Sequence, residues 1–155
     1  MIAYNWDKAK KQVNDWKLSG CRIVFTNGCF DILHRGHVEY LIEAKACGDK
    51  LVIALNSDSS VRSLKGDTRP IQNQEDRAVI LDSLESVDLV VVFEQETPAK
   101  IINSLLPDVL VKGGDYTEDI VVGADTVTKE GGQIKIIPFR SGYSTSIIFE
   151  KIVKL

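Results

Sequence analysis

The feature that most limits what this chain can fold into is a series of short apolar runs separated by helix-like stretches. The runs read IVF, LVIAL, LVVVF and VLV, without alternation of polar and apolar residues. Strands that are buried on both faces have this pattern, which is typical of parallel sheets covered by helices. We therefore expect an α/β fold, a single doubly wound domain with a parallel sheet of about five strands.

The runs and their flanking signals set approximate limits for the elements. Strands are expected over residues 21–26, 51–55, 88–93, 109–111 and 133–138. Helices are expected over residues 37–47 and 74–84, and a third should begin at position 98. The last helix should run from residue 145 to near 155. Asn73 and Ser144 are expected to cap two of these helices. The first 20 residues are expected to form an N-terminal helix that ends at Gly20.

Composition excludes several classes of protein. With 19 basic and 22 acidic residues the formal charge is −3, without the basic surplus of a general nucleic-acid binder. The three cysteines form no CxxC pair, which favours a reducing compartment. The charged N-terminus is no signal peptide, and no run of about 18 apolar residues exists. We expect a cytoplasmic protein without a membrane partner.

The loop after the first predicted strand is the strongest candidate for chemistry. It reads TNGCFDILHRGHVEYL and holds both histidines of the chain, His34 and His37, on either side of Gly36. Imidazoles three residues apart at a helix start can face one ligand, and the free N–H groups there favour an anion. Two alternatives remain: one histidine caps the helix while the other packs, or Cys29 joins both histidines in a metal site.

Three further loops follow predicted strands, where ligands bind in open α/β sheets. NSDSSVRSLKGDTRPI supplies the cations Lys65 and Arg69, LVKGGDY brings two glycines, and RSGYSTSII places Ser144 and Thr145 at a helix start. The GxGxxG fingerprint is absent after the first strand, and GxxxxGK[ST] is absent throughout. A common dinucleotide site and a P-loop are therefore excluded.

The motif His34-Arg35-Gly36-His37 resembles the HxGH signature of the nucleotidylyltransferase superfamily. The segments LKGDTRPI, LPDVLVKGGDY, IVVGAD and GYSTSII resemble, in this order, the branch of adenylyltransferases that act on D-glycero-D-manno-heptose 1-phosphate. The resemblance runs from about Cys21 to Ile152. It implies a Rossmann-like sheet of order 3-2-1-4-5 and a nucleotidyltransferase domain over residues 21–155.

The resemblance also implies an activity. ATP and D-glycero-D-manno-heptose 1-phosphate would give ADP-heptose and pyrophosphate, with Mg²⁺ on the phosphates and a homodimer or higher homo-oligomer as the assembly. The partners would be nucleotide and sugar 1-phosphate, not nucleic acid. One alternative is a glycerol- or alditol-phosphate cytidylyltransferase, and a second, from another class, is a Cys/His metal-binding regulatory domain.

By the same resemblance, the catalytic residues would be His34, His37 and Lys65. The nucleotide would be bound by Asn27, Gly28, Cys29, Phe30, Asp31, Gly36, Asn56, Asp58, Arg69, Arg77, Lys112, Gly113, Gly114, Asp115, Ser144 and Thr145, and no protein site for a metal is expected. Two positions depart from the pattern: Ser146 replaces a common threonine, and Arg140 lies one residue away from the place of a phosphate-binding arginine.

Overall fold

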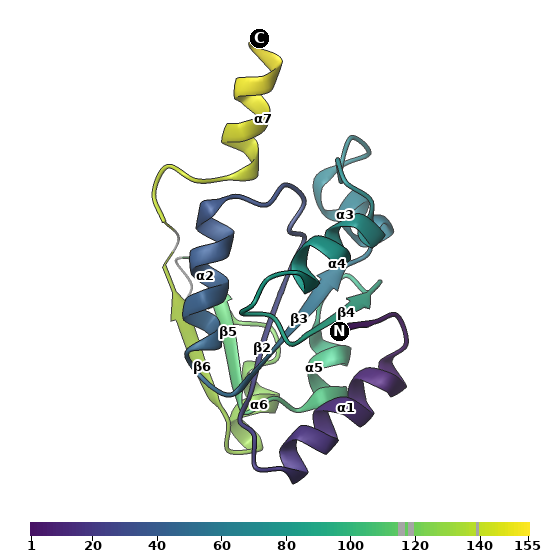
Figure 1. Cartoon of the computed structure of the whole chain (residues 1–155), viewed down its shortest axis with the longest axis vertical. Helices are drawn as coiled ribbons and strands as arrows, with labels where there is room; N and C mark the ends of the chain where they lie inside the picture. The colour runs from purple at the N-terminus through teal and green to yellow at the C-terminus, as the bar shows by residue number, and fades with distance from the viewer. Residues whose placement is uncertain (115–116, 118–119, 139) are drawn as a thin grey trace.

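A parallel sheet runs through the middle of the molecule, with helices on both of its faces (Figure 1). The computed structural model describes residues 1–114, 117, 120–138 and 140–155. The strands are β1 (Ile2–Ala3), β2 (Ile23–Gly28), β3 (Lys50–Asn56), β4 (Leu89–Phe93), β5 (Val109–Gly113) and β6 (Gln133–Ile137). They lie in the order β1-β4-β3-β2-β5-β6, and every neighbouring pair is parallel.

The sheet has six strands, one more than the five predicted from the sequence. The five expected strands are β2 to β6, and their order β4-β3-β2-β5-β6 is the expected 3-2-1-4-5. The sixth strand, β1, extends the sheet beyond β4 through the pairs Ile2–Val90 and Ala3–Val91. Two residues are too few to show a periodicity, so the N-terminal segment was expected to contain only a helix.

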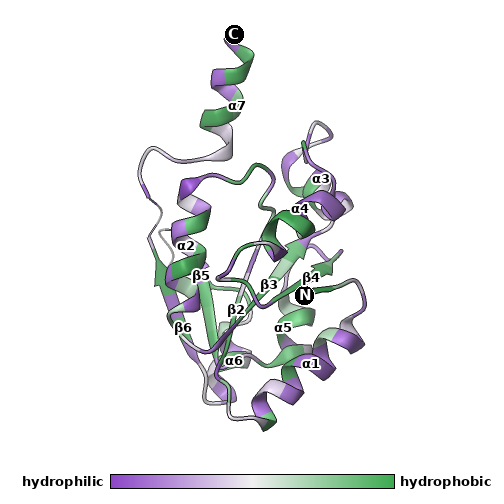
Figure 2. Ribbon diagram, in the orientation of Figure 1, coloured by the Kyte–Doolittle hydropathy of each residue, from purple (hydrophilic) through white to green (hydrophobic). Residues whose placement is uncertain are grey.

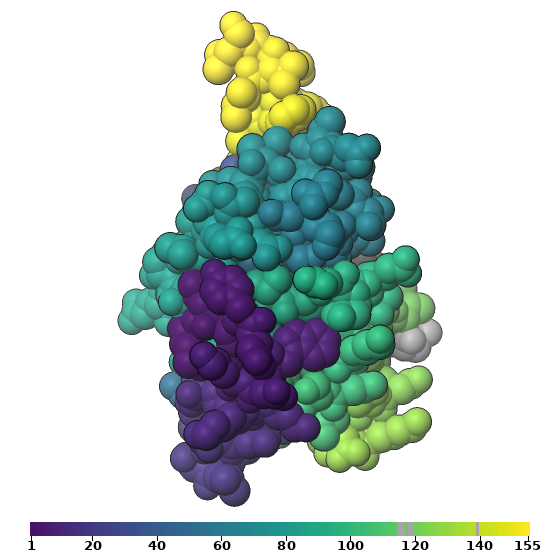
Figure 3. Space-filling model, turned by 90° about the vertical axis from the view of Figure 1, so that its right-hand side faces the viewer, coloured from purple at the N-terminus to yellow at the C-terminus, as the bar shows by residue number. Residues whose placement is uncertain are grey.

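Each face of the sheet is covered by its own set of helices. One face is covered by α1 (Trp6–Leu18), α5 (Ala99–Leu105) and α6 (Ala124–Lys129), and the other by α2 (Arg35–Lys45) and α4 (Gln74–Asp82). The strands form the apolar centre of the molecule in Figure 2, and α1 lies on the surface seen in Figure 3. The continuous apolar runs are therefore explained by burial on both sides.

The segment after β3, expected to be a loop, begins with a helix. Ser57 is the N-cap of this helix, α3 (Asp58–Lys65), and its hydroxyl accepts a hydrogen bond from the Ser60 N–H at 3.2 Å. It ends at Gly66, which has a φ of 92° that favours glycine. Lys65 is thus the last residue of a helix and not part of a flexible loop.

The last helix, α7 (Thr145–Val153), projects away from the rest of the molecule (Figures 1 and 3). Ser144 caps it as expected, since its hydroxyl accepts from the Ile147 N–H at 3.1 Å. None of its residues is buried, and apolar side chains such as Phe149 and Ile152 are exposed. None of the helices formed by the described residues is long and apolar enough to cross a membrane.

The strand order defines where a ligand can enter. From the central β2 the chain moves first to β3 on one side and later to β5 on the other. At such a switch point the loops leaving the two strands separate, and a crevice opens outside their carboxyl ends. The histidine loop follows β2, and Lys112 and Gly113 form the end of β5, so both lie at this crevice.

Candidate active site

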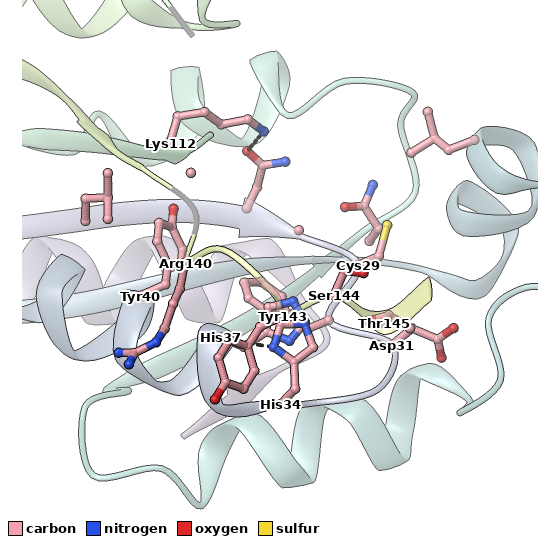
Figure 4. Close-up of a pocket in the computed structure, with 18 of the residues that line it drawn as sticks. Cys29, Asp31, His34, His37, Tyr40, Lys112, Arg140, Tyr143, Ser144 and Thr145 are labelled. Atoms are coloured by element: carbon pink, nitrogen blue, oxygen red, sulfur yellow. Dashed lines mark hydrogen bonds between the residues drawn. The ribbon is translucent and has the colours of Figure 1, made fainter. Parts of the chain in front are cut away.

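A pocket of about 950 Å³ lies at the carboxyl ends of the strands, within the size range of ligand sites. It brings together most of the residues predicted from the sequence. Those that line it are Asn27, Gly28, Cys29, Phe30, Asp31, His34, Gly36, His37, Asn56, Lys65, Lys112, Gly113, Ser144 and Thr145. Segments up to 118 positions apart in the chain therefore form one site, as Figure 4 shows for ten of its labelled residues.

Five predicted site residues are not found on the pocket wall. Asp58, Arg69, Arg77 and Gly114 are described but do not line it. Asp115 lies outside the described residues. The contacts of the two arginines within the protein are given below, and their predicted role in nucleotide binding stays a prediction.

His34 both caps α2 and faces the pocket. Its Nδ1 accepts a hydrogen bond from the His37 N–H at 3.3 Å, and burial lowers the pKa of its imidazole. A neutral ring that accepts at Nδ1 carries its proton at Nε2. The capping interaction therefore leaves Nε2–H as a donor for a ligand, so capping and binding coexist in one residue.

His37 stacks on His34, with ring centroids 3.8 Å apart and planes 18° apart, and its edge meets Phe30 (Figure 4). Burial lowers the pKa of His37 to about 4, helped by the charges of His34 and Lys65 and opposed by the backbone of Ile32. The ring is therefore neutral near pH 7. Its Nδ1 atom is buried without a well-formed hydrogen bond to the described residues.

Two glycines let the backbone come close to the pocket. A Cβ on Gly28 would lie 2.8 Å from the Phe30 ring, and one on Gly36 would lie 3.0 Å from Tyr143 and 3.1 Å from His34. Phe30 itself has a φ of 45°, which is rare for a residue with a side chain. Strained backbone of this kind clusters at functional sites.

Two lysines supply positive charge to the pocket. Lys65 approaches from the end of α3, close enough to lower the pKa of His37. Lys112 extends from β5 towards Asn27, with its Nζ 3.5 Å from Oδ1, and burial lowers its pKa. Burial raises the pKa of the Cys29 thiol, although both lysines oppose the shift, so Cys29 is a neutral thiol.

Arg77 does not line the pocket, so its predicted contact with the nucleotide stays a prediction. The side chain is fully buried on α4. It donates to the carbonyl oxygens of Cys29 at 2.6 Å, Asn56 at 2.9 Å and Gln72 at 3.0 Å, and to the Asp58 carboxylate at 2.7 Å. Arg77 therefore fixes the ends of β2 and β3, and Asp58 pairs with Arg77.

Arg69 also acts through a neighbour instead of lining the pocket. Its guanidinium donates to the Asp31 carboxylate at 2.8 Å, and the N–H groups of Ile71 and Gln72 donate to the same carboxylate. Burial of Asp31 raises its pKa, but these three donors outweigh burial and the net shift is downwards. The ionised Asp31 thus fastens the 69–72 segment to the histidine loop.

The start of α7 closes one side of the pocket. Thr145 donates its hydroxyl to the Ile32 carbonyl at 3.2 Å, so the terminal motif touches the histidine loop directly. Arg140 lines the pocket as well and forms an ion pair with Glu39 of α2. Its guanidinium lies 5.7 Å from the Tyr143 ring centre (Figure 4).

The metal-site alternative finds no support among the described residues. They contain no group of three or more His, Cys, Asp or Glu side chains that could hold an ion. Cys29, His34 and His37 are all described, and the two imidazoles stack on each other instead of converging on a point.

Several pocket residues were missed by the sequence analysis. They are Glu39, Tyr40, Glu43, Leu64, Glu96, Thr97, Pro98, Val122, Ile137, Pro138, Tyr143 and Ser146. Glu96 and Thr97 follow β4 directly, so the rule that sites lie after strands could have found them. Tyr40 and Glu43 are on the pocket side of α2, which a helical pattern alone does not reveal.

The crevice outside the switch point, the HxGH loop at a helix start and the converging lysines define the class of the molecule, a nucleotidyltransferase domain. More narrowly, the chain belongs to the cytidylyltransferase-like family, whose model matches residues 25–151. The match covers the histidine loop, both lysines and the start of α7.

Among curated proteins, the chain is similar to "Bifunctional protein HldE" of Wolinella succinogenes, with 57% identity over 146 residues. The alignment covers 94% of this chain and 30% of that protein. The protein of the same name from Rhodospirillum rubrum is 54% identical over 90% of this chain and 28% of its own length. The chain therefore spans somewhat less than a third of these relatives.

Among solved structures, the chain is similar to a lipopolysaccharide core biosynthesis protein from Thermoplasma volcanium. The TM-score is 0.65 and the sequence identity is 31%. The superposition covers 81% of this chain and all of the other chain. A pantoate–β-alanine ligase from Francisella tularensis has a TM-score of 0.64 at 17% identity, covering all of this chain and 78% of the other. The second likeness shows the shared fold alone.

Proposed function

We propose that this domain transfers the adenylyl group of ATP to D-glycero-D-manno-heptose 1-phosphate, giving ADP-heptose and pyrophosphate. The observation that carries the proposal is the convergence of four sequence segments on one pocket, the same segments that resemble the heptose 1-phosphate adenylyltransferases. The similarity to bifunctional HldE proteins supports it. So does the likeness to a protein described as acting in lipopolysaccharide core biosynthesis.

In the proposed reaction an oxygen of the sugar phosphate attacks the α-phosphorus of ATP. The new P–O bond forms as the bond to the pyrophosphate oxygen breaks, with the two oxygens in line. The attacking phosphate is already ionised near pH 7, so no base has to remove a proton. Catalysis then depends on positioning and on stabilising charge on the phosphoryl oxygens.

His34 and His37 would donate hydrogen bonds to those oxygens. Both rings are kept neutral by burial and carry an N–H each, and they lie at the start of α2 where the helix dipole favours an anion. Lys65 would add its positive charge beside His37 as negative charge moves towards the leaving group. Ser144 and the N–H groups at the start of α7 would hold the outer phosphates.

The nucleoside would occupy the end of the pocket near β5 and β6. This end is lined by apolar groups of Val122, Ile137 and Pro138 and by the backbone of Gly113, which suit a flat base. The carbon skeleton of Tyr40 lies there too, and burial raises the pKa of its phenol to about 12, so the ring stays uncharged. Lys112 would contact the ribose or a phosphate.

Mg²⁺ would accompany the nucleotide. Because no cluster of acidic, Cys or His ligands exists among the described residues, the ion would be held mostly by phosphate oxygens and water. Its chemical contribution would be to neutralise phosphate charge. The residues of the chain would orient the phosphates around it.

Pyrophosphate release, measured with ATP, CTP, GTP and UTP in turn against a panel of sugar 1-phosphates, tests the proposal. We expect the highest kcat/KM with ATP and heptose 1-phosphate. Faster turnover with CTP and glycerol phosphate would establish the cytidylyltransferase alternative instead. The cytoplasmic location and the homo-oligomer implied by the resemblance remain predictions, the latter tested by sedimentation of the purified chain.

A further inference from the structure

The pocket has two ends of different chemistry. Along the carboxyl edge of the sheet the order is β4, β3, β2, β5, so the ends of β4 and β5 are about 14 Å apart at a usual strand spacing. Next to β5 and β6 the wall has the apolar groups of Val122, Ile137 and Pro138 beside Lys112, whereas next to β3 and β4 it has the polar side chains of Asn56, Glu96 and Thr97. The histidine loop, after β2, lies between the two.

In-line transfer assigns a substrate to each end. Attacking and leaving oxygens lie on opposite sides of the α-phosphorus. If the base occupies the apolar end and the outer phosphates lie at the start of α7, the acceptor has to approach from the β3–β4 end. This step rests on the proposed function, because it takes the position of the nucleotide from it.

Glu96 is an unusual residue for a pocket that receives two phosphorylated substrates. The other carboxylates near the phosphate-binding loop are neutralised: Asp31 accepts three hydrogen bonds including one from Arg69, and Glu39 pairs with two arginines. Glu96 is exposed to the pocket, and the ion pairs formed by the described residues do not include it. A phosphate beside it would be repelled, whereas sugar hydroxyls donate readily to a carboxylate.

Among the described residues, Glu43 is the remaining carboxylate that lines the pocket, and it belongs to the opposite end. It lies one helical turn after Tyr40, whose hydroxyl is 3.4 Å from the Val111 carbonyl of β5. Glu96, by contrast, follows β4. Of the carboxylates that line the pocket in the described part of the chain, Glu96 alone lies at the end from which the acceptor approaches.

The segment that carries Glu96 is held in place before any ligand binds. The Ser60 hydroxyl donates to the Gln95 carbonyl at 3.2 Å and accepts from the Asn56 side chain at 2.9 Å. The Oε1 atom of Gln95 is buried without a hydrogen-bond partner among the described residues. The Glu96 carboxylate is therefore presented to the pocket from a segment that is already fixed.

We propose that Glu96 determines acceptor specificity by accepting hydrogen bonds from hydroxyl groups of the sugar phosphate, away from its phosphate. The residue selects a polyhydroxylated acceptor at the β3–β4 end of the pocket. It takes no part in the chemistry at the α-phosphorus.

The test compares Glu96→Ala and Glu96→Gln with the wild-type chain, measuring KM for the sugar phosphate and for ATP separately. Glu96→Ala should raise KM for heptose 1-phosphate about 10- to 100-fold, as expected for losing hydrogen bonds to a charged group. KM for ATP and kcat should be unchanged, because uniform binding of the acceptor is lost. Glu96→Gln keeps an acceptor oxygen and should recover part of the loss.

Glu94→Gln is the matched control, since Glu94 is an exposed carboxylate of the same segment that does not line the pocket. It should leave both KM values unchanged. An unchanged KM for the sugar phosphate in Glu96→Ala, an equal rise in KM for ATP, or a raised Mg²⁺ requirement would overturn the inference. If the wild-type chain releases no pyrophosphate with heptose 1-phosphate, the proposed function itself is refuted. That outcome is distinguished from failure of the inference about Glu96 because it is measured on the wild-type chain alone.

Discussion

Replacing Arg77 by methionine should destabilise the domain strongly even though the residue touches no ligand. Arg77 is fully buried and donates to three carbonyl oxygens and to Asp58. Methionine is unbranched and fills much of the same space, so the loss reports on the polar contacts. Removing one partner of a buried ion pair costs about 3–5 kcal/mol, and each buried carbonyl left without a donor costs about 1–3 kcal/mol.

The Asp58 side chain is 24% exposed, so water can reach its carboxylate and the ion-pair part of the loss should lie near the lower limit, about 3 kcal/mol, to which the carbonyl groups add. Urea unfolding measures the loss: with a slope of about 2 kcal/mol/M, the midpoint should fall by at least about 1.5 M. Arg62→Met, at an exposed position of α3, is the control and should change stability by less than about 0.5 kcal/mol. A loss below about 1 kcal/mol for Arg77→Met would refute the reasoning that Arg77 fastens β2 and β3 together.

The remaining predictions concern the pocket. Lys65→Ala should lower kcat and kcat/KM together, because its charge is needed most in the transition state; a rise in KM for ATP alone would reduce Lys65 to a binding residue. Cys29→Ala should keep most activity in steady-state assays, since the thiol is neutral and the loop contributes its backbone; a large loss would make the sulfur a functional group. His37 should titrate near pH 4 by NMR, against about 6.5 when unfolded. The unfolded chain then binds a proton that the folded chain does not, so the contribution of His37 to stability is present above pH 6.5 and is lost as the pH falls towards 4. His37→Asn should flatten this pH dependence, and an unchanged slope would contradict the neutral, buried ring.

The sheet could be predicted from the sequence because strands buried on both faces leave an unbroken apolar pattern. β2 to β5 have such runs, whereas β6, which reads QIKII, is less buried. Two of the helices have recognisable caps, at Asn73 and Ser144. β1 and α3 leave weaker signals. β1 is two residues long, and α3 exposes polar residues such as Ser59 and Arg62 to solvent, so its sequence reads like a surface loop.

The site could be predicted in part for a similar reason. Residues at the carboxyl ends of the strands and in the segments that follow them are brought together by the topology, which explains why His34, Lys65 and Lys112 share one pocket. The direction of a side chain depends on tertiary contacts that no local pattern encodes. Arg77 looks like a ligand-binding cation in the sequence, yet α4 points it into the interior towards three carbonyl oxygens.

The most direct test of the account follows the oxygen atoms of the reaction. Heptose 1-phosphate carrying oxygen-18 in its non-bridging phosphate oxygens is incubated with ATP and the purified chain, and both products are analysed by mass spectrometry. Attack by the sugar phosphate on the α-phosphorus predicts that ADP-heptose retains all of the label and that pyrophosphate has none. Labelled pyrophosphate, or release of AMP and pyrophosphate without ADP-heptose, would contradict the account.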